Sequence, residues 1–251
     1  MKISAVIIVK NEEKKIALCL GSLKWADEVI VVDGFSTDGT VETARSFGAK
    51  VIMRKFTGSF ADDRNAGLDE AKNDWVLQLD ADEVVRSGFA EKAEAAVLLA
   101  KNAAAFKFRR VNFFLGHSMD HGGFHHYIPN FVNKRLVRFD GKVHEVPVCK
   151  GDILALEADI EHHPFDNLSQ FIMRQDRYAS IAAAEMLKKE GVLPEKIIRK
   201  NLVGKSFKIF FKSYFKKQGY REGAYGLVFA VLFAFINFLK WAKYWELVKD
   251  G

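Results

Sequence analysis

The stretch Trp75–Glu83, whose sequence is Trp-Val-Leu-Gln-Leu-Asp-Ala-Asp-Glu, decides how the rest of the chain is interpreted. Its first five residues form a short and bulky apolar run, which predicts a buried strand. Acidic side chains follow at the carboxyl end of that strand, where open α/β sheets place their ligands. An acidic, solvated turn before a helix would have a similar sequence, so the surrounding residues have to separate a binding site from a turn.

The acids Asp80 and Asp82 lie two positions apart, and in an extended chain their side chains would share a face. Two carboxylates that converge on one point repel each other unless a cation lies between them. Mg²⁺ or Mn²⁺, held by one or two carboxylates together with phosphate oxygens, is the natural occupant of such a place. We therefore predict a divalent metal at Asp80 and Asp82.

The sequence before this stretch predicts a parallel sheet. Apolar runs at residues 3–9, 28–33 and 50–53 alternate with helical patterns, and the fourth run is the stretch quoted above. Asn11 is expected to cap the first helix, with acids in the first helical turn. Strands that alternate with helices indicate an α/β domain whose sheet is covered on both faces.

Polar residues follow three of these predicted strands, namely Asn11 with Glu12, then Asp33, then the acids after Leu79. Several polar side chains at one edge of a parallel sheet indicate a crevice for ribose hydroxyls and phosphates. The first strand is not followed by Gly-x-Gly-x-x-Gly, and Gly-x-x-x-x-Gly-Lys-Ser/Thr is absent from the sequence. Dinucleotide-binding and P-loop interpretations therefore lose their main support.

Four segments, in this order, carry a resemblance to a known family. They are Val-Ile-Ile-Val-Lys-Asn-Glu-Glu, Val-Asp-Gly-Phe-Ser-Thr-Asp-Gly-Thr, Asp-Arg-Asn-Ala-Gly-Leu and Leu-Asp-Ala-Asp-Glu. Together they are similar to the family 2 nucleotide-sugar glycosyltransferases, which have the GT-A fold. The resemblance implies a nucleotide-diphosphate sugar as donor, with a UDP-sugar favoured, a divalent metal, and inversion at the anomeric carbon.

The resemblance also implies roles for particular residues. The residues that it places at the donor are Asn11, Glu12, Asp33, Arg64 and Asp80. Arg64 would approach the base or the diphosphate, Asp80 the ribose and the metal, and Asp82 would be the main metal ligand. The chain departs from the family pattern at Val9-Lys10, where Pro-Thr/Ser-Tyr is frequent, and at Gly34, where a second Asp is frequent, so the base contacts are less well specified than the metal site.

The middle of the chain provides a candidate base. An Arg-Leu pair at residues 135–136 and a Val-His-Glu at residues 143–145 follow the metal motif, in an order that resembles a subgroup building bacterial lipopolysaccharide inner core. An acidic residue acts as base at this point in other members, which implies that role for Glu145. Two structural alternatives stay open: Glu145 could pair with Arg135 or Arg138, and His144 could be a hydrogen-bonding core residue.

Histidines provide weaker signals. His117, His121, His125 and His126 lie among glycines, but their spacings fit no closed tetrahedral zinc site, and we favour a mobile loop at the acceptor site. His162 is a second candidate, because a late histidine completes the metal shell in some GT-A enzymes. A packed, hydrogen-bonded histidine is the alternative for His162.

The C-terminal region has a different character. A helix is predicted from Leu168 to Lys189, and the segment from Lys196 to Arg221 then contains nine Lys or Arg residues, several aromatic residues and no acid. Gly226 to Leu239 is almost wholly apolar but is shorter than the ~20 residues of a spanning helix. These features favour docking on an anionic membrane face, with a buried helix of a helical cap as the alternative. The pattern of a nucleic-acid-binding module is absent, so no nucleic-acid partner is expected.

Length, net charge and cysteine content limit the class of protein. The chain has 251 residues, a net charge of +6 and two cysteines, which predicts neither a disulfide framework nor a structural zinc cluster. The N-terminus lacks the pattern of a signal peptide. We expect a GT-A catalytic domain over residues 1–165 and a helical, membrane-associating extension over residues 166–251, in a cytoplasmic protein that is peripheral on the inner membrane face.

The expected function is inverting, metal-dependent transfer of a hexose, with glucose as first candidate, to a membrane-held glycolipid such as lipopolysaccharide core. A nucleotidyltransferase also uses paired acids and a metal. It usually carries a glycine-rich basic loop after the first strand, where this chain has Lys10-Asn11-Glu12. The non-enzymatic alternative is a catalytically inactive, membrane-bound scaffold of the same fold.

Overall fold

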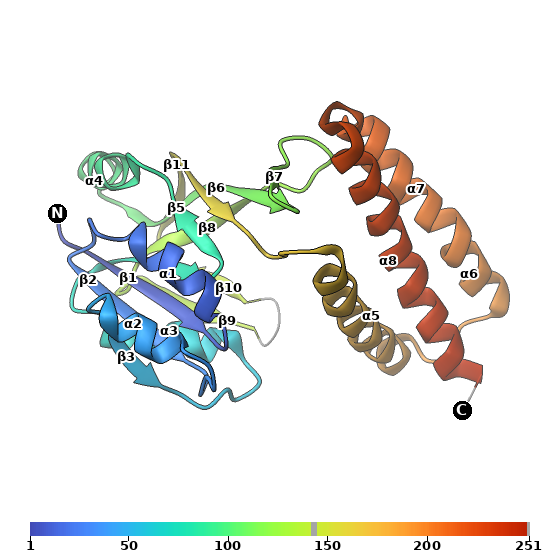
Figure 1. Cartoon of the computed structure of the whole chain (residues 1–251), viewed down its shortest axis with the longest axis horizontal. Helices are drawn as coiled ribbons and strands as arrows, with labels where there is room; N and C mark the ends of the chain where they lie inside the picture. The colour runs from blue at the N-terminus through green and yellow to red at the C-terminus, as the bar shows by residue number, and fades with distance from the viewer. Residues whose placement is uncertain (142–144, 250–251) are drawn as a thin grey trace. The chain divides into compact units, whose positions relative to one another are not determined.

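The computed structural model describes residues 1–141 and 145–249, which form two compact units (Figure 1). The first unit comprises Met1–Arg110 and His126–His162, and the second comprises Val111–His125 and the chain from His163 onward. The chain therefore leaves the first unit, returns to it and leaves it again. The assignment of catalysis to residues 1–165 and of membrane association to residues 166–251 stays a prediction.

The first unit is built on one mixed sheet. Its elements are β1 (Ile3–Val9), α1 (Glu13–Gly21), β2 (Glu28–Asp33), α2 (Thr40–Ser46), β3 (Lys50–Met53), α3 (Phe60–Glu70), β4 (Trp75–Asp80), β5 (Glu83–Val85), α4 (Phe89–Leu99), β6 (Ala103–Phe114), β8 (His126–Asn133), β9 (Val137–Asp140), β10 (Val146–Cys149) and β11 (Asp152–His162). The strand order is β3-β2-β1-β4-β8-β6-β11-β5, and β9 and β10 form a separate antiparallel pair. The predicted α/β fold with helices flanking the sheet is confirmed.

Strands β1 to β4 are parallel to one another, as predicted. The other half of the sheet is joined through antiparallel pairs, such as β4 with β8 and β11 with β5. Within this half, the alternating apolar and polar residues from Phe106 to Val111 predict one strand, which the structure extends to all of β6, and the other strands were not predicted.

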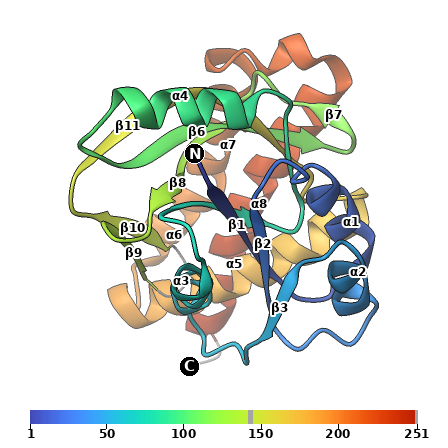
Figure 2. The same cartoon turned by 90° about the vertical axis from the view of Figure 1, so that its left-hand side faces the viewer.

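Side-chain alternation along β1 distributes its residues between two cores. Ile3, Ala5 and Ile7 pack with residues of α1, α2 and α4, whereas Val6 packs with residues of α3. Figure 2 shows α3 on one side of β1 and β2 and the pair α1–α2 on the other. Because successive residues of a strand point to opposite faces, a continuous apolar run is what a sheet covered on both faces requires.

The prediction that Asn11 caps the first helix is wrong. Helix α1 begins at Glu13, and Glu12 occupies the N-cap position. Asn11 has φ of 55°, in the left-handed region that asparagine tolerates better than most residues. Its side chain instead joins two loops, because Asn11 Oδ1 accepts a hydrogen bond from the Thr37 backbone N–H.

The second unit is mainly helical. It contains β7 (His117–Ser118), α5 (Leu168–Glu190), α6 (Glu195–Arg199), α7 (Ser206–Phe211) and α8 (Gly223–Lys249), with π-helical turns at Lys200–Lys205 and Lys212–Lys216 and a 3-10 turn at Gly219–Glu222. Helix α8 packs against both α5 and α7. Two small apolar cores hold these helices, one around Phe114, Phe171 and Phe229, and one around Trp241 and Tyr244.

The expectation of an apolar segment too short to cross a membrane is corrected by the length of α8. Beyond Leu239 the helix continues through Lys240, Trp241, Lys243 and further residues to Lys249. By length and composition alone, the helical stretch Gly219–Lys249 could span a membrane. Core helices of soluble proteins meet the same criteria of length and composition.

Candidate functional site

The loops that follow β1 and β2 are tied together by hydrogen bonds. Asp33, which is fully buried, accepts from the Ser36 backbone N–H at 2.8 Å and from the Ser36 hydroxyl at 2.6 Å. The Asn11 backbone N–H donates to the Ser36 hydroxyl oxygen, and Asn11 Oδ1 accepts from the Thr37 N–H, each at 2.8 Å. The Glu12 N–H donates to the Thr40 hydroxyl oxygen at 3.0 Å. The predicted nucleoside residues Asn11, Glu12 and Asp33 thus lie in one cross-linked pair of loops at the carboxyl edge of the sheet.

Arg64 joins two acids that are far apart in sequence. Its Nη2 donates to Asp80 Oδ1 at 2.8 Å, and its Nε donates to Glu145 Oε1 at 3.0 Å. Arg64 lies on α3 and is 4% exposed, Asp80 ends β4, and Glu145 precedes β10. The guanidinium also lies over the Phe139 ring, with 5.7 Å from its carbon to the ring centroid. The fold therefore brings the candidate base and a candidate metal ligand to one buried cation.

The two arginines considered as alternative partners of Glu145 bind elsewhere. Arg135 pairs with Asp74 at 2.8 Å, and Arg138 pairs with Asp69 at 2.7 Å. The other alternative, a core role for His144, concerns a residue outside the described part of the chain.

The charge on Arg64 is secured by its neighbours. Burial alone would lower the pKa of the guanidinium, but the carboxylates of Asp80, Glu145 and Glu83 raise it above its ordinary value. Arg64 Nη1 is also buried and has no hydrogen-bond partner among the described residues. Buried polar atoms are nearly always satisfied, so this nitrogen is a candidate contact for a ligand oxygen.

Asp80 and Asp82 do not share the face of an extended strand, contrary to the prediction. Strand β4 ends at Asp80, and residues 81 and 82 form a turn before β5 begins at Glu83. Asp82 Oδ1 lies 3.6 Å from His162 Nε2, on β11, while Asp80 faces Arg64. The side chains of Asp80 and Asp82 are therefore oriented by different partners. His162 therefore lies beside the metal motif, and its role as a metal ligand stays a prediction.

Glu83 is a site residue that the sequence analysis did not single out. It is completely buried, and its Oε2 accepts from the Asp80 backbone N–H at 2.9 Å, while its Oε1 accepts from Arg110 at 3.3 Å. Burial raises the pKa of Glu83 to about 7, and Asp80 adds to the rise, whereas Arg110 and His162 oppose it. Glu83 thus closes the turn that presents Asp82. Its position directly after the metal motif was the available signal.

The chemistry of this donor set fits a hard divalent cation held jointly with a ligand. Among the described residues, no three His, Cys, Asp or Glu side chains converge closely enough to hold a metal alone. Mg²⁺ and Mn²⁺ are commonly bound through one or two carboxylates plus substrate phosphates. Asp82 can provide a carboxylate of this kind, and Asp80 and His162 are further candidate ligands beside it. A metal held between the turn and a diphosphate is consistent with this geometry.

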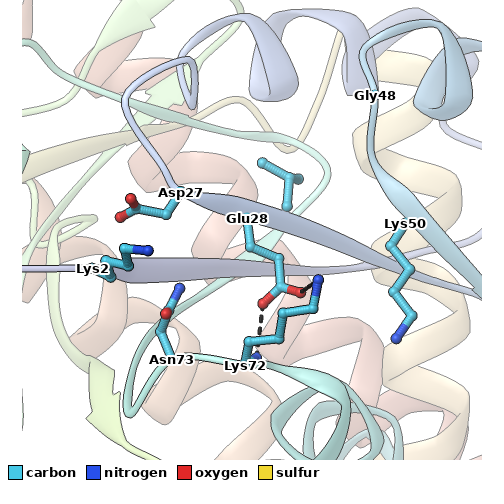
Figure 3. Close-up of a pocket in the computed structure, with 8 residues that line it drawn as sticks. Lys2, Asp27, Glu28, Gly48, Lys50, Lys72 and Asn73 are labelled. Carbon is cyan, nitrogen blue, oxygen red and sulfur yellow. Dashed lines mark hydrogen bonds and ion pairs between the residues drawn. The ribbon is translucent and has the colours of Figure 1, made fainter.

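Two other polar clusters lie away from this edge. In the second unit, His117 Nε2 and His121 Nδ1 contact the two oxygens of Glu222, at 2.8 and 2.6 Å. In the first unit, a hollow of about 330 Å³ lies at the amino ends of β2 and β3, lined by Asp27, Glu28, Lys50 and other residues (Figure 3). Open α/β sheets bind ligands at the opposite edge, so this hollow is not the candidate site. An acceptor-site role for the histidine loop stays a prediction.

An acidic turn at the carboxyl edge of a parallel half-sheet, met there by a buried Arg from α3 and by a candidate base that precedes β10, is an arrangement suited to nucleotide-dependent group transfer. The chain belongs to glycosyl transferase family 2, whose family model matches residues 4–151. It is therefore a glycosyltransferase, and the nucleotidyltransferase interpretation is not supported.

Individual relatives cover nearly the whole chain. A glycosyltransferase of Rickettsia bellii (strain RML369-C) is 30% identical over 98% of this chain and 87% of its own length. The lipopolysaccharide core biosynthesis glycosyltransferase LpsC of Rhizobium meliloti (strain 1021) is 24% identical over 98% of this chain and 93% of its own length. Among solved structures, S. aureus TarS 1-349 in complex with UDP-GlcNAc matches with a TM-score of 0.50 and 16% identity, over 100% of this chain and 91% of that one. The last likeness concerns the fold alone.

Proposed function

We propose that the protein transfers a hexose from a UDP-sugar to a hydroxyl of a membrane-held glycolipid, with a divalent metal and with inversion at the anomeric carbon. The observation that carries the proposal is the pairing of Arg64 with both Glu145 and Asp80. It gathers a cation for a diphosphate, a carboxylate suited to proton transfer and the metal motif at the edge of the sheet where donors bind.

The proposed donor is supported by the polar residues at the carboxyl ends of the parallel strands. Asn11, Glu12 and Asp33 lie in the cross-linked loops after β1 and β2, and Arg64 offers a buried nitrogen without a partner among the described residues. TarS, which shares the fold, was solved with UDP-GlcNAc. We therefore infer a uridine nucleotide sugar, and we place its diphosphate beside Arg64 and the turn at Asp82.

The proposed metal site is supported by the turn that contains Asp82. A divalent ion bound by Asp82, with Asp80 and His162 as further candidates, would neutralise the departing nucleoside diphosphate. Arg64 would support the same charge through its guanidinium. Glu83, by holding the Asp80 N–H, keeps the turn in a defined conformation.

Glu145 is the proposed general base. A base within hydrogen-bond reach of the acceptor hydroxyl takes its proton as the oxygen attacks the anomeric carbon. The carboxylate of Glu145 is held by Arg64 through one hydrogen bond, to Oε1. A single displacement of this kind inverts the anomeric configuration and needs no covalent enzyme intermediate.

The proposed acceptor rests on a relative. LpsC is named for lipopolysaccharide core biosynthesis, and its alignment with this chain extends beyond the catalytic motifs to nearly the full length. We propose lipopolysaccharide core, or a glycolipid like it, as the acceptor.

A donor screen tests the proposal. The full-length chain is incubated with UDP-, GDP- and CMP-sugars and Mn²⁺, and products are identified by mass spectrometry while binding is measured by thermal shift. We expect slow hydrolysis of one UDP-hexose, with release of UDP and free sugar, and faster consumption when a core glycolipid is added. Release of sugar 1-phosphate, or its formation together with a nucleoside triphosphate when pyrophosphate is added, would identify a nucleotidyltransferase, and absence of binding to every nucleotide would identify the scaffold. Either result overturns the proposal.

A further inference from the structure

A stripe of exposed aromatic side chains runs along the basic helical segment of the second unit. Phe207, Phe211 and Phe215 are 64%, 45% and 51% exposed. Neighbouring rings of the stripe are 4.8 and 5.1 Å apart between centroids, so the three rings form one continuous apolar strip. Each of these phenylalanines is followed directly by a lysine, which gives three Phe-Lys pairs at a spacing of four residues.

The helical geometry of this segment keeps the stripe nearly straight. Four residues exceed the 3.6-residue turn of an α-helix, so side chains at this spacing drift around an α-helix. Helix α7 is flanked by π-helical turns at Lys200–Lys205 and Lys212–Lys216, in which the hydrogen bonds span five residues and the turn is wider. Alternation of the two geometries partly cancels the drift.

The lysines form a parallel cationic row. Lys208, Lys212 and Lys216 are exposed, and none of them makes an ion pair with a residue that the structure describes. The segment from Lys196 to Arg221 contains no Asp or Glu. A helix with aromatic residues on one side and uncompensated cations beside them has the composition of interfacial membrane-binding helices.

We infer that this stripe docks in the plane of an anionic lipid surface, with the phenylalanine rings inserted at the boundary of the acyl chains and the lysines at the headgroups. Charge complementarity favours lipid over a second copy of the chain. Face-to-face packing of two such stripes would bring two rows of unpaired lysines together. The inference needs neither donor nor acceptor and stands apart from the proposed reaction.

The packing of α8 argues for docking in the plane over spanning by α8. Its Asn237 donates to the Ser206 hydroxyl at 2.9 Å, its Lys243 pairs with Asp176 on α5 at 2.8 Å, and its Tyr244 donates to the Gly191 carbonyl. A spanning α8 would have to leave these polar partners or draw the charged helix α5 into hydrocarbon, where unpaired polar groups are costly. Only 22% of the most apolar window of α8 is buried, so its free side provides further apolar area for contact with lipid.

Vesicle flotation with the full-length chain tests the inference. The probes are vesicles of phosphatidylcholine alone and of phosphatidylcholine mixed with phosphatidylglycerol, at low and high salt. We expect binding only to the mixed vesicles, with partial release by salt, because screening weakens the electrostatic part and not the inserted part. Release by alkaline carbonate is also expected of a helix that lies in the surface.

Two triple variants separate the two contributions. Replacement of Phe207, Phe211 and Phe215 by Ser should weaken binding about 10-fold or more and leave the remainder fully sensitive to salt. Replacement of Lys208, Lys212 and Lys216 by Gln should weaken binding about 100-fold at low salt. Matched controls are Leu98→Ser with Leu99→Ser, on exposed positions of α4, and the triple change of Lys14, Lys24 and Lys101 to Gln, which removes the same charge elsewhere.

Several outcomes would overturn the inference. The inference is wrong if the wild type does not bind mixed vesicles, or if the stripe variants and the control variants lose binding equally. It is also wrong if carbonate does not release the bound wild type, because that result favours a spanning α8. A dimer in solution that becomes a monomer in the phenylalanine variant would assign the stripe to a second copy. Circular dichroism of every variant verifies that a lost interaction is not a lost fold.

Discussion

At the scale of single residues, Glu145 and Arg64 form the contact on which the proposed chemistry depends. Glu145→Gln keeps the shape of the side chain and can still meet Arg64 through its amide oxygen, but it cannot accept a proton at neutral pH. Loss of a general base commonly lowers the rate 10²–10⁴-fold. We therefore expect turnover to fall by about this factor while the dissociation constant of the donor changes little.

Transfer kinetics and calorimetric donor binding measure the two quantities separately. Glu157→Gln, at an exposed position of β11, is the matched control and should behave as wild type. A loss of donor affinity with unchanged turnover would make Glu145 a donor-site or structural residue.

Asp82→Ala tests the metal motif. The residue lies in a turn and not in a core, so we expect a folded protein that no longer binds Mn²⁺ and has lost transfer activity. Mn²⁺ binding is measured by electron paramagnetic resonance in the presence of UDP, which gives a readout besides activity. Asp152→Ala, on an exposed position of β11, controls for loss of a surface acid. Near-normal activity that chelators do not affect would exclude the metal role of Asp82.

The sequence predicted which residues belong at the sheet edge better than it predicted how they meet. Asp33 and Asp80 lie at strand ends that follow from local apolar runs, and such runs are visible in sequence. The contact of Arg64 with Glu145 joins residues 81 positions apart. No local pattern encodes such a pair, and the ion-pair partners considered for Glu145, as the alternative to its role as base, were the nearby Arg135 and Arg138. The turn at Asp82 was missed because two acids after a strand look alike in an extended chain and in a turn.

At the scale of elements, the close approach of α3 to β1 depends on Gly67. A Cβ added to this residue would lie 2.2 Å from Val6 Cγ1 in the fully buried core. Gly67→Ala would therefore push α3, which carries Arg64, away from the sheet. We expect a loss of about 1–3 kcal/mol in the free energy of unfolding, measured with urea.

Gly21, the last residue of α1, is the matched control for Gly67. A Cβ there would meet nothing within 4 Å. Gly21→Ala should leave stability unchanged or raise it by up to ~1 kcal/mol, because alanine has the higher helix propensity. Equal effects of the two substitutions would show that the contact with Val6 relaxes without cost.

The contact of Glu222 with the histidine loop predicts a dependence of stability on pH. Although burial raises the pKa of Glu222, its hydrogen bonds with His117 and His121 outweigh burial and hold the pKa below its ordinary value. A carboxyl whose pKa is lower in the folded state stabilises the fold above its unfolded pKa, and the contribution is lost as pH falls through the folded pKa.

We therefore expect Glu222→Gln to lower stability at neutral pH by about 1–3 kcal/mol, with a difference from wild type that shrinks at acidic pH. Thermal unfolding over a series of pH values measures it. Glu185→Gln, on α5, is the control within the same unit. A difference that stays constant down to acidic pH would contradict the assignment.

Strands and helices were predicted correctly where one pattern, either an apolar run or a helical spacing, continued through the whole element. The strands β1 to β4 and the helix α5 agree closely with their predicted ranges. The antiparallel half of the sheet was missed because β8 and β11 mix exposed polar residues with apolar ones, and their pairing partners are distant in sequence. The length of α8 was underestimated because the count stopped at Lys240, where charged residues begin but the helix continues.

At the scale of the whole molecule, the cores of the second unit decide which experiment can separate catalysis from membrane binding. Helix α8 contributes Phe229, Trp241 and Tyr244 to these cores. A chain truncated near Gly223 would expose the facing sides of α5 and α7, and loss of activity would then report unfolding. Substitutions of exposed residues on the Phe-Lys stripe leave both cores intact.

The last prediction combines the stripe with the proposed reaction. The triple change of Phe207, Phe211 and Phe215 to Ser should lower transfer to an acceptor held in mixed vesicles about 10-fold, because the enzyme spends less time at the surface where the acceptor lies. Transfer to the same acceptor in detergent micelles and hydrolysis of the sugar nucleotide in solution should stay at the wild-type rate, since these residues lie outside the candidate site. Equal loss in vesicles and micelles would place the stripe in acceptor recognition. Unchanged transfer in vesicles would show that membrane docking by the stripe, even if it occurs, does not serve catalysis.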